Sequence, residues 1–355
     1  MSLRRARWAF EALALGGLFV LTFLFPGALG GWLEVALGLL FPILLFDAVL
    51  RDRPLPFIFL AFLAGLVSLF HWVPRTLVTK GGVPPSVAIL GSGLFWAWEA
   101  LGLLGVAAFA RWMHRRSPRW GAAFGAAFGI VLWEAFAFHI YGWTWGAALG
   151  GLPFFARSAA FLGTFGFSAF AWGAGAWAGA HLSEGRPGIA LRAPAVALAL
   201  LAALGLGWRL LPRERPRELD VVMIQPNFPA GERFPGMEAE MWRRSDEVLR
   251  ARQLPRPGAP CLLLWPESSV LGRDDRLPNP RLASEAARRG VAWLFGTEGG
   301  LYNLVRGEVA DRPAFIQAKT QPMAFGERMP GPEPMRRWLD HQLGFLSQRP
   351  AVHHL

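Results

Sequence analysis

The sequence predicts a multi-pass α-helical membrane domain followed by a soluble α/β domain. The chain of 355 residues is 53% hydrophobic and only 17% charged, which is unusually apolar for a soluble protein. The charge is also unevenly distributed, because residues 1–211 consist largely of Leu, Ala, Gly, Phe and Trp, whereas residues 220–355 have an ordinary soluble composition. We therefore predict a transmembrane domain over 1–211, a charged, proline-rich linker over 212–219 and a globular domain over 220–355.

Apolar segments long enough to form transmembrane helices recur along the first domain. A spanning helix needs about 20 mainly apolar residues to cross about 30 Å of hydrocarbon. We predict about seven such helices, at residues 8–25, 31–50, 55–73, 86–110, 120–139, 157–181 and 189–211. Because further spans follow the first segment, we expect this segment to be an anchor and not a cleaved signal peptide.

The arginines predict how this domain is oriented. Clusters precede the first segment and follow the second, fourth and sixth, so seven spans place them all on one side: Arg4, Arg5, Arg7, Arg51, Arg53, Arg111, Arg115, Arg116, Arg119 and Arg186. The other side has only Arg75, Lys80 and Arg157. Because loops rich in Lys and Arg face the cytoplasm, we predict a multi-pass protein of the cell (inner) membrane. Its N-terminus would be cytoplasmic and its globular domain would lie on the outer, periplasmic side.

Four glutamates lie within or near the predicted spans, at Glu11, Glu34, Glu99 and Glu134. A carboxylate inside a membrane is a functional candidate by default. For Glu99 and Glu134, which lie deepest, we favour hydrogen bonds between helices over chemistry. The stretches HWVPRTLVTKGG and YGWTWGAALGGLPFF are predicted outer loops. Their Trp and Phe content suits either an interfacial belt or a mouth that admits lipid chains.

The globular domain shows the alternation of strands and helices that is typical of an α/β fold. Apolar runs predict strands at DVVMIQPN, CLLLWPE, VAWLFGTE, LYNLVRG and PAFIQAKT. Residues 237–252 are predicted to form an amphipathic helix with Met237, Met241, Val248 and Leu249 on its apolar side. A second helix is predicted over 279–290, with Pro280 at its first position and Gly290 at its end. Together these elements predict a sheet that is covered by helices.

Two residues of opposite charge directly follow predicted strands. Glu267 follows CLLLWP and Lys319 follows PAFIQA, while Glu298 ends VAWLFGT. In open α/β sheets the chemistry gathers beyond the carboxyl ends of the strands. All but 2 of the 36 basic residues are Arg, and the exceptions are Lys80 and Lys319. A lysine at 319 therefore favours a role that needs a compact or titratable ammonium group.

Cys261 is the only cysteine and stands close to Glu267 in the sequence, which suggests a nucleophile and its base. Six residues of extended chain, however, separate their Cα atoms by about 20 Å, whereas such a pair must approach within about 3 Å. We therefore predict that Cys261 is a small buried hydrophobic residue. A single cysteine also excludes an intramolecular disulfide and a Cys-based zinc site.

Several of these stretches carry a resemblance to a known family. The motifs are the loop after HW at 71–72, WEAF at 133–136, GWTWGAALGG at 142–151, VVMIQPNFPAGERF, LLLWPESS, GLYNL and KTQPMAFGERMP. With them the chain resembles the apolipoprotein N-acyltransferases, a membrane branch of the carbon–nitrogen hydrolase (nitrilase) superfamily. In that superfamily a Glu, a Lys and a Cys from three strand ends form the active site of an α-β-β-α sandwich.

The resemblance implies a role for individual residues. Glu267 matches the catalytic general base and Lys319 matches the cation of the triad. Glu327 matches a supporting carboxylate, because AFGE stands here at the eight-residue spacing where relatives have PFGE. Phe234 occupies a place where relatives often have a mobile aromatic residue that contacts substrate. Tyr302 and Asn303 match a Tyr-Asn motif with a structural role.

One part of the family pattern has no counterpart in residues 1–355. The family nucleophile lies in a Cys-Tyr-Glu motif well beyond the Gly-Glu motif, whereas this sequence ends at AVHHL. No residue here corresponds to that cysteine or to the final membrane span of the family. We therefore expect an incomplete hydrolase domain, from either a truncated reading frame or a degenerate member.

The resemblance implies an acyltransferase that needs no metal or organic cofactor. It would move a fatty acyl chain from a phospholipid, through a Cys thioester, to the α-amine of an S-diacylglyceryl-cysteine on an apolipoprotein. Its partners would be the phospholipid donor, the diacylated apolipoprotein and the bilayer. Nucleic acid is not an expected partner, because many of the arginines behind the net charge of +11 flank the spans. Two alternatives are a membrane-anchored amidase or nitrilase, and a non-catalytic relative that binds lipoproteins.

Overall fold

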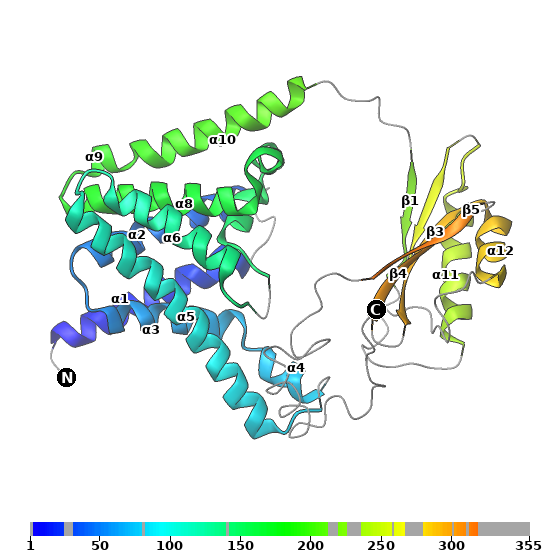
Figure 1. Cartoon of the computed structure of the whole chain (residues 1–355), viewed down its shortest axis with the longest axis horizontal. Helices are drawn as coiled ribbons and strands as arrows, with labels where there is room; N and C mark the ends of the chain where they lie inside the picture. Colours follow the sequence, from blue (N-terminus) through cyan, green and yellow to red (C-terminus); the bar gives the residue numbers. More distant parts are fainter. Residues whose placement is uncertain are drawn as a thin grey trace. The chain divides into compact units, whose positions relative to one another are not determined.

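The computed structural model describes residues 3–24, 31–79, 82–139, 142–211, 219–225, 236–257, 259–266, 280–299, 302–309 and 312–318 (Figure 1). The chain divides into two compact units, Met1–Pro212 and Arg213–Leu355. This division agrees with the composition change at the predicted linker, most of which lies outside the described residues.

Within its described residues, the first unit consists of helices joined by turns and short irregular segments, and it contains no strand. The shorter elements are the helices α4 (Val73–Thr79), α7 (Pro153–Ala156) and α9 (Pro187–Ala190) and the 3-10 helix η2 (Trp145–Gly151). The longer helices are α1 (Leu3–Leu24), α2 (Trp32–Leu50), α3 (Leu55–Leu69), α5 (Pro85–Arg116), α6 (Gly121–Phe136), α8 (Ala159–Ser183) and α10 (Arg192–Leu210). Each of the predicted apolar segments thus contains a helix.

Four of these stretches are long and apolar enough to cross a membrane. They are α2, α5, α8 and the stretch Pro187–Trp208, which joins α9 to α10. A fifth arises if α3 and α4, which meet at a bend of 44°, are counted as one span. The apolar part of α1, Trp8–Leu24, and helix α6 are shorter. The described residues therefore fit a membrane protein with four or five spans, and the count of seven stays a prediction.

Small residues allow the long helices to approach closely. A Cβ atom added at Gly175 of α8 would lie 2.6 Å from the Cβ of Pro42 in α2, and one at Gly179 would lie 2.6 Å from the backbone nitrogen of Asp47. Gly125 of α6 faces Ala110 of α5 in the same way, at 2.9 Å from its Cα. Within a bilayer such close backbone contact stabilises helix association through van der Waals packing.

The arginines that follow α2 and those in the last turns of α5 meet at one end of the helical unit, which we call the basic end. A side-chain nitrogen of Arg111 in α5 donates to the backbone oxygen of Arg53 at 2.7 Å, and Arg115 pairs with Asp52 at 2.8 Å. Arg51 at the end of α2 donates to the backbone oxygen of Leu182 near the end of α8 at 3.1 Å. These contacts gather the ends of α2, α5 and α8, as the positive-inside pattern predicts. Which side of a membrane this end faces stays a prediction.

Both predicted outer loops contain short helices. α4 forms within HWVPRTLVTKGG, and η2 forms within YGWTWGAALGGLPFF. The idea of an interfacial belt is wrong for Trp145, which is fully buried. Its indole nitrogen donates to the backbone oxygen of Gly38 at 2.9 Å, and its rings contact Phe41 and Trp172. The loop turns back into the helical core because this large aromatic side chain is buried there.

The second unit contains a five-stranded mixed sheet in the order β1-β2-β3-β4-β5. Strands β1 and β2 are parallel, β2 and β3 are parallel, and the two remaining pairs are antiparallel. The strands are β1 (Asp220–Met223), β2 (Cys261–Leu264), β3 (Ala292–Gly299), β4 (Tyr302–Val309) and β5 (Arg312–Ala318). Every predicted strand is confirmed. Among the described residues, helices occur in the connections between parallel strands, whereas antiparallel neighbours need just a short turn.

Helices α11 (Met237–Ala251) and α12 (Pro280–Arg289) cover one face of this sheet (Figure 1). Their core holds three tryptophans in mutual contact, Trp242, Trp265 and Trp293, with ring centroids 4.4 to 4.6 Å apart. Met237, Met241 and Leu249 of α11 are buried as predicted, whereas Val248 is 38% exposed. The prediction for Val248 was wrong because Trp242 and Ser245 complete the buried side of α11 instead.

Candidate functional site

The carboxyl ends of β2, β3 and β5 lie at the same edge of the sheet. β2 and β3 are parallel, and two successive antiparallel pairings return β5 to their direction. One register row crosses the sheet through Leu264, Leu294, Gly307 and Phe315. Beyond this row, β2 continues in the sequence to Pro266 and β5 continues to Ala318. This common edge is where an α/β sheet presents catalytic groups.

The edge also has a defined width. β2 and β5 are separated by three strand spacings, so they lie about 14 Å apart along the sheet. β3 and β4 lie between these two strands. Side chains that follow β2 and β5 can therefore act on one substrate only if both extend toward the carboxyl end of β3. The antiparallel pair β4 and β5, which the sequence analysis did not foresee, creates this separation.

All four predicted site residues, Glu267, Lys319, Glu327 and Phe234, lie outside the described residues, as does Lys80. The structure does describe the chain up to Pro266 and Ala318, the neighbours that precede Glu267 and Lys319. The end of β2 stays attached to β3, because the backbone N–H of Trp265 donates to the oxygen of Leu294 at 2.8 Å.

The backbone of the Tyr-Asn motif lies in β4 and pairs with the end of β3. Tyr302 lies opposite Gly299, and Asn303 lies opposite Glu298. The motif thus forms part of the hairpin that brings the chain from β3 into β4, which is consistent with a structural role. Glu298 stands near the carboxyl end of β3, at the edge described above.

Cys261 is a packing residue, as predicted. It is the first residue of β2, lies opposite Asp220 of β1 and is only 2% exposed. Burial, together with the nearby charge of Asp220, raises the pKa of its thiol above the ordinary value. A buried thiol of raised pKa is a poor nucleophile, and Cys261 begins the strand whose far end leads to Glu267.

The Trp-Pro pair before Glu267 is fixed by the core. Trp265 is 6% exposed, and its indole nitrogen donates to the hydroxyl of Ser245 in α11 at 2.9 Å. The hydroxyl of Ser245 donates in turn to the backbone oxygen of Met241 at 2.8 Å. This chain of hydrogen bonds attaches the chain just beyond β2 to α11, two residues before Glu267 in the sequence.

In the helical unit, Glu134 joins three elements. One of its carboxylate oxygens accepts from the backbone N–H of Trp145 at 2.7 Å and from the hydroxyl of Ser168 at 2.9 Å. The hydroxyl oxygen of Ser168 also accepts from the backbone N–H of Gly146 at 2.7 Å. The carboxylate therefore ties α6 to η2 and α8, which confirms the predicted hydrogen bonding between helices.

Glu99 forms a second buried polar contact, and its partner was missed by the sequence analysis. The side chain of Glu99 in α5 is 0% exposed, and its carboxylate lies 2.9 Å from the imidazole Nδ1 of His139. The imidazole Nε2 lies 3.1 Å from the backbone oxygen of Trp133. One signal in the sequence could have identified His139, because it is an ionisable residue at the end of the predicted span 120–139. These neighbours account for both nitrogens of the imidazole without invoking catalysis.

Among the described residues, no group of three or more His, Cys, Asp or Glu side chains is arranged to hold a metal ion.

Comparison with known proteins gives no assignment: no family model matches the chain, and no curated protein sequence matches it.

Proposed function

We propose that the chain carries the membrane domain and hydrolase-domain residues of an apolipoprotein N-acyltransferase. The observation that carries the proposal is the shared direction of β2 and β5, since Glu267 and Lys319 directly follow these strands in the sequence. A strand-end carboxylate and a strand-end lysine match the base and the cation of the family triad. The apolar helices of the first unit suit an enzyme whose substrates are lipids.

The open face of the sheet supports the finer proposal of an α-β-β-α sandwich. On β1, Val221 is 53% exposed and Met223 is 72% exposed, although Val222 between them is buried. Within the described residues, helices cover only the face on which Val222 lies. Exposed apolar side chains on a sheet normally pack against a second layer, and in the sandwich fold that layer is a second sheet.

In the first half-reaction, Glu267 accepts the proton of the nucleophilic thiol, and the thiolate attacks the ester carbonyl of a phospholipid. A C–S bond forms, and Lys319 as an ammonium ion stabilises the oxyanion. The C–O bond then breaks, and the leaving lysophospholipid oxygen takes the proton from Glu267. The products of this step are an acyl thioester and a lysophospholipid.

In the second half-reaction, the α-amine of a diacylglyceryl-cysteine attacks the thioester. Glu267 accepts a proton from the amine, a C–N bond forms, and the C–S bond breaks to release the thiolate, which takes the proton back. Covalent catalysis of this kind divides one difficult exchange into two easier ones. In the family that the chain resembles, the thiol belongs to a Cys-Tyr-Glu motif, and Cys261, which is buried at the start of β2, is not assigned this role.

The test is acyl transfer from phospholipid to a diacylated lipopeptide by a protein that carries residues 1–355 and the in-frame codons downstream. We expect Glu267→Gln to lower the rate by about 10²- to 10⁴-fold, as for loss of a general base. Lys319→Met should lower it by about 10²- to 10³-fold, as for loss of oxyanion stabilisation. The matched controls are Glu247→Gln and Arg252→Met at exposed positions near the end of α11. Normal rates in the first two variants would refute the assigned roles.

The same protein separates the two alternatives. Hydrolysis of a small soluble amide without acyl transfer would identify an amidase. Absence of any turnover, with lipopeptide still bound, would identify the non-catalytic relative. The downstream DNA gives the first indication, because a Cys-Tyr-Glu motif there, in frame or shifted, favours the enzyme.

A further inference from the structure

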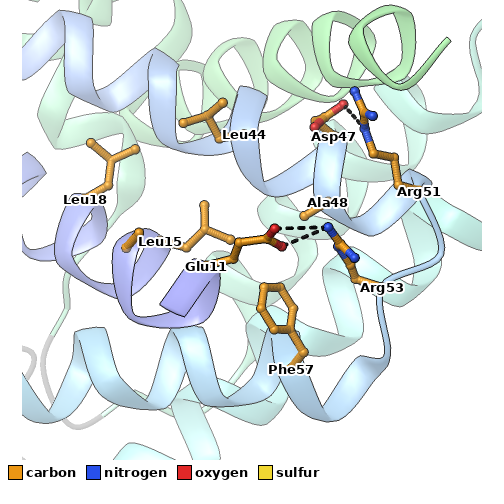
Figure 2. A pocket seen from close by; sticks show the side chains of 10 residues that line it. Glu11, Leu15, Leu18, Leu44, Asp47, Ala48, Arg51, Arg53 and Phe57 are labelled. Carbon is orange, nitrogen blue, oxygen red and sulfur yellow. Dashed lines mark hydrogen bonds and ion pairs between the residues drawn. The ribbon is translucent and has the colours of Figure 1, made fainter. Parts of the chain in front are cut away.

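A pocket of about 300 Å³ lies at the basic end of the helical unit, between α1, α2 and α3 (Figure 2). Its charged residues are Glu11 of α1, Asp47 and Arg51 at the end of α2, and Arg53 of the α2–α3 turn. Its apolar lining includes Ala14, Leu15, Leu18, Leu44, Ala48 and Phe57. All lining residues belong to the first unit, and none is among the predicted catalytic residues.

The lining changes from charged to apolar along the helices. Glu11 of α1 and Arg51, which directly follows α2, stand at the charged rim. α1 and α2 each supply a leucine seven residues from these positions, Leu18 and Leu44. Seven residues of helix span about 10 Å. The pocket thus has a charged rim and an apolar wall about two helical turns long. An amphiphilic ligand matches this arrangement, because it has a charged headgroup and apolar chains. Figure 2 shows the leucines on one side and the ion pairs on the other.

The charges at the rim are balanced. Arg53 contacts Glu11 at 2.9 Å and Arg51 contacts Asp47 at 2.8 Å, as Figure 2 shows with dashed lines. Two carboxylates and two guanidinium groups give a formal sum of zero, so the rim has no net attraction for an anion. A zwitterion is the complementary ligand, because its phosphate can meet an arginine while its ammonium meets a carboxylate. Each guanidinium has five N–H donors, enough to keep its carboxylate and to bind a phosphate oxygen.

Small residues keep the space open. Ala14 of α1 and Ala48 of α2 both line the pocket, and Ala14 is exposed. A volume of about 300 Å³ is at the lower end of the range for small-molecule sites, so the pocket suits a headgroup and the first part of its acyl chains. The rest of the chains would lie along the exposed apolar surface of the helices.

We propose that this pocket binds one zwitterionic aminophospholipid from the leaflet at the basic end, with its phosphate at Arg51 and Arg53 and its ammonium at Glu11 and Asp47. The proposal requires helices in a bilayer and does not depend on acyl transfer. It describes a resident lipid within α1–α3, separate from any acyl donor at the strand ends.

The test uses the full chain reconstituted in vesicles of equimolar phosphatidylethanolamine and phosphatidylglycerol, extracted mildly and analysed by native mass spectrometry. We expect one retained phosphatidylethanolamine for the wild type and none for Ala14→Leu, whose side chain fills the pocket. The matched control is Ala195→Leu, an exposed alanine three residues from Arg192 of α10, just as Ala14 is three residues from Glu11. The control should retain the lipid.

A second variant tests the charge argument even if Ala14→Leu does not fold. Glu11→Gln combined with Asp47→Asn leaves both arginines without carboxylates, so the retained lipid should change to anionic phosphatidylglycerol. Equal retention of both lipids by the wild type, or no change in this variant, would overturn the proposal. So would retention by Ala14→Leu equal to that of the wild type. Equally tight binding of free phosphoethanolamine or inorganic phosphate would instead indicate a site for a soluble ligand, and would also overturn it.

Discussion

The indole nitrogen of Trp265 donates a hydrogen bond to the hydroxyl of Ser245 at 2.9 Å in the core of the second unit. Trp265 stands two residues before Glu267 in the sequence, so helix α11 holds the chain directly after β2. The sequence alone shows Trp-Pro-Glu at the end of an apolar run, and the structure adds the anchor that holds it. An active site at this edge would depend on a helix about 20 positions earlier in the chain.

Ser245→Ala should destabilise the second unit. It leaves the buried indole N–H of Trp265 without its acceptor, and such a loss costs about 1–3 kcal/mol. Resistance of the second unit to proteolysis with increasing urea, measured on the full chain, gives the change in unfolding free energy. The control is Ala287→Ser, the reverse exchange at an exposed position of α12. Equal destabilisation by both exchanges would contradict the role of the hydrogen bond.

Cys261 should react slowly with alkylating reagents. Burial raises its pKa, so at a given pH less thiolate is present than in an ordinary cysteine. The measurement is iodoacetamide labelling against pH, read by mass spectrometry, for the folded and the urea-unfolded chain. The folded chain should reach half-maximal labelling at the higher pH. Faster labelling of the folded chain would indicate an activated thiol, and Cys261 would then be a candidate nucleophile.

Glu240 should make α11 sensitive to acid. Hydrogen bonds from Arg243 and Arg244 lower its pKa to about 2 in the folded protein, compared with about 4.3 in an unfolded chain. Because the folded pKa is depressed, this contribution is fully present above about pH 4.3 and is lost as the pH falls toward about 2. Glu240→Gln should therefore weaken the hydrogen-exchange protection of α11 at neutral pH. In this variant the protection should also decrease less than in the wild type as the pH falls from about 4.3 to about 2. An unchanged acid dependence would contradict the interaction.

Gly146→Ala should destabilise the helical unit. A Cβ at this position would lie 2.1 Å from the backbone oxygen of Thr164, so η2 and α8 would have to separate. Overpacking of this kind costs about 1–3 kcal/mol, which should lower the thermal unfolding midpoint in detergent. Gly150→Ala in the same 3-10 helix is the control, because its Cβ would meet no atom within 4 Å. Similar midpoints for the two variants would disprove the close packing.

Local pattern was sufficient to predict most of the fold. The helices of the first unit follow from apolar segments, and the strands of the second follow from short apolar runs, because both depend on neighbours in the sequence. Cys261 was predicted correctly because strand geometry alone sets its distance from Glu267. Val248 was not, because the buried side of α11 is decided by the tryptophans that pack against it.

Contacts between residues far apart in the chain could not be predicted from the sequence. The pairing of Glu99 with His139 depends on where the turn after α6 returns to α5, and the burial of Trp145 depends on space between α2 and α8. The pocket at Glu11 and Arg53 arises from the meeting of three helices. For the predicted active site, the sequence identified strand ends, but the antiparallel return of β4 and β5 sets their separation.

The most direct test of acyl transfer is the mass of a diacylated lipopeptide after incubation with phospholipid vesicles and the protein extended through its downstream codons. We expect a gain of one fatty acyl group on the α-amine that is unchanged by Cys261→Ala. If the downstream codons supply a Cys-Tyr-Glu motif, changing its cysteine to Ala should abolish this gain. Residues 1–355 alone should leave the mass unchanged. Acyl transfer by 1–355, or its loss on Cys261→Ala, would contradict the assignment of the nucleophile. No gain in mass with the intact extended protein would contradict the acyltransferase itself.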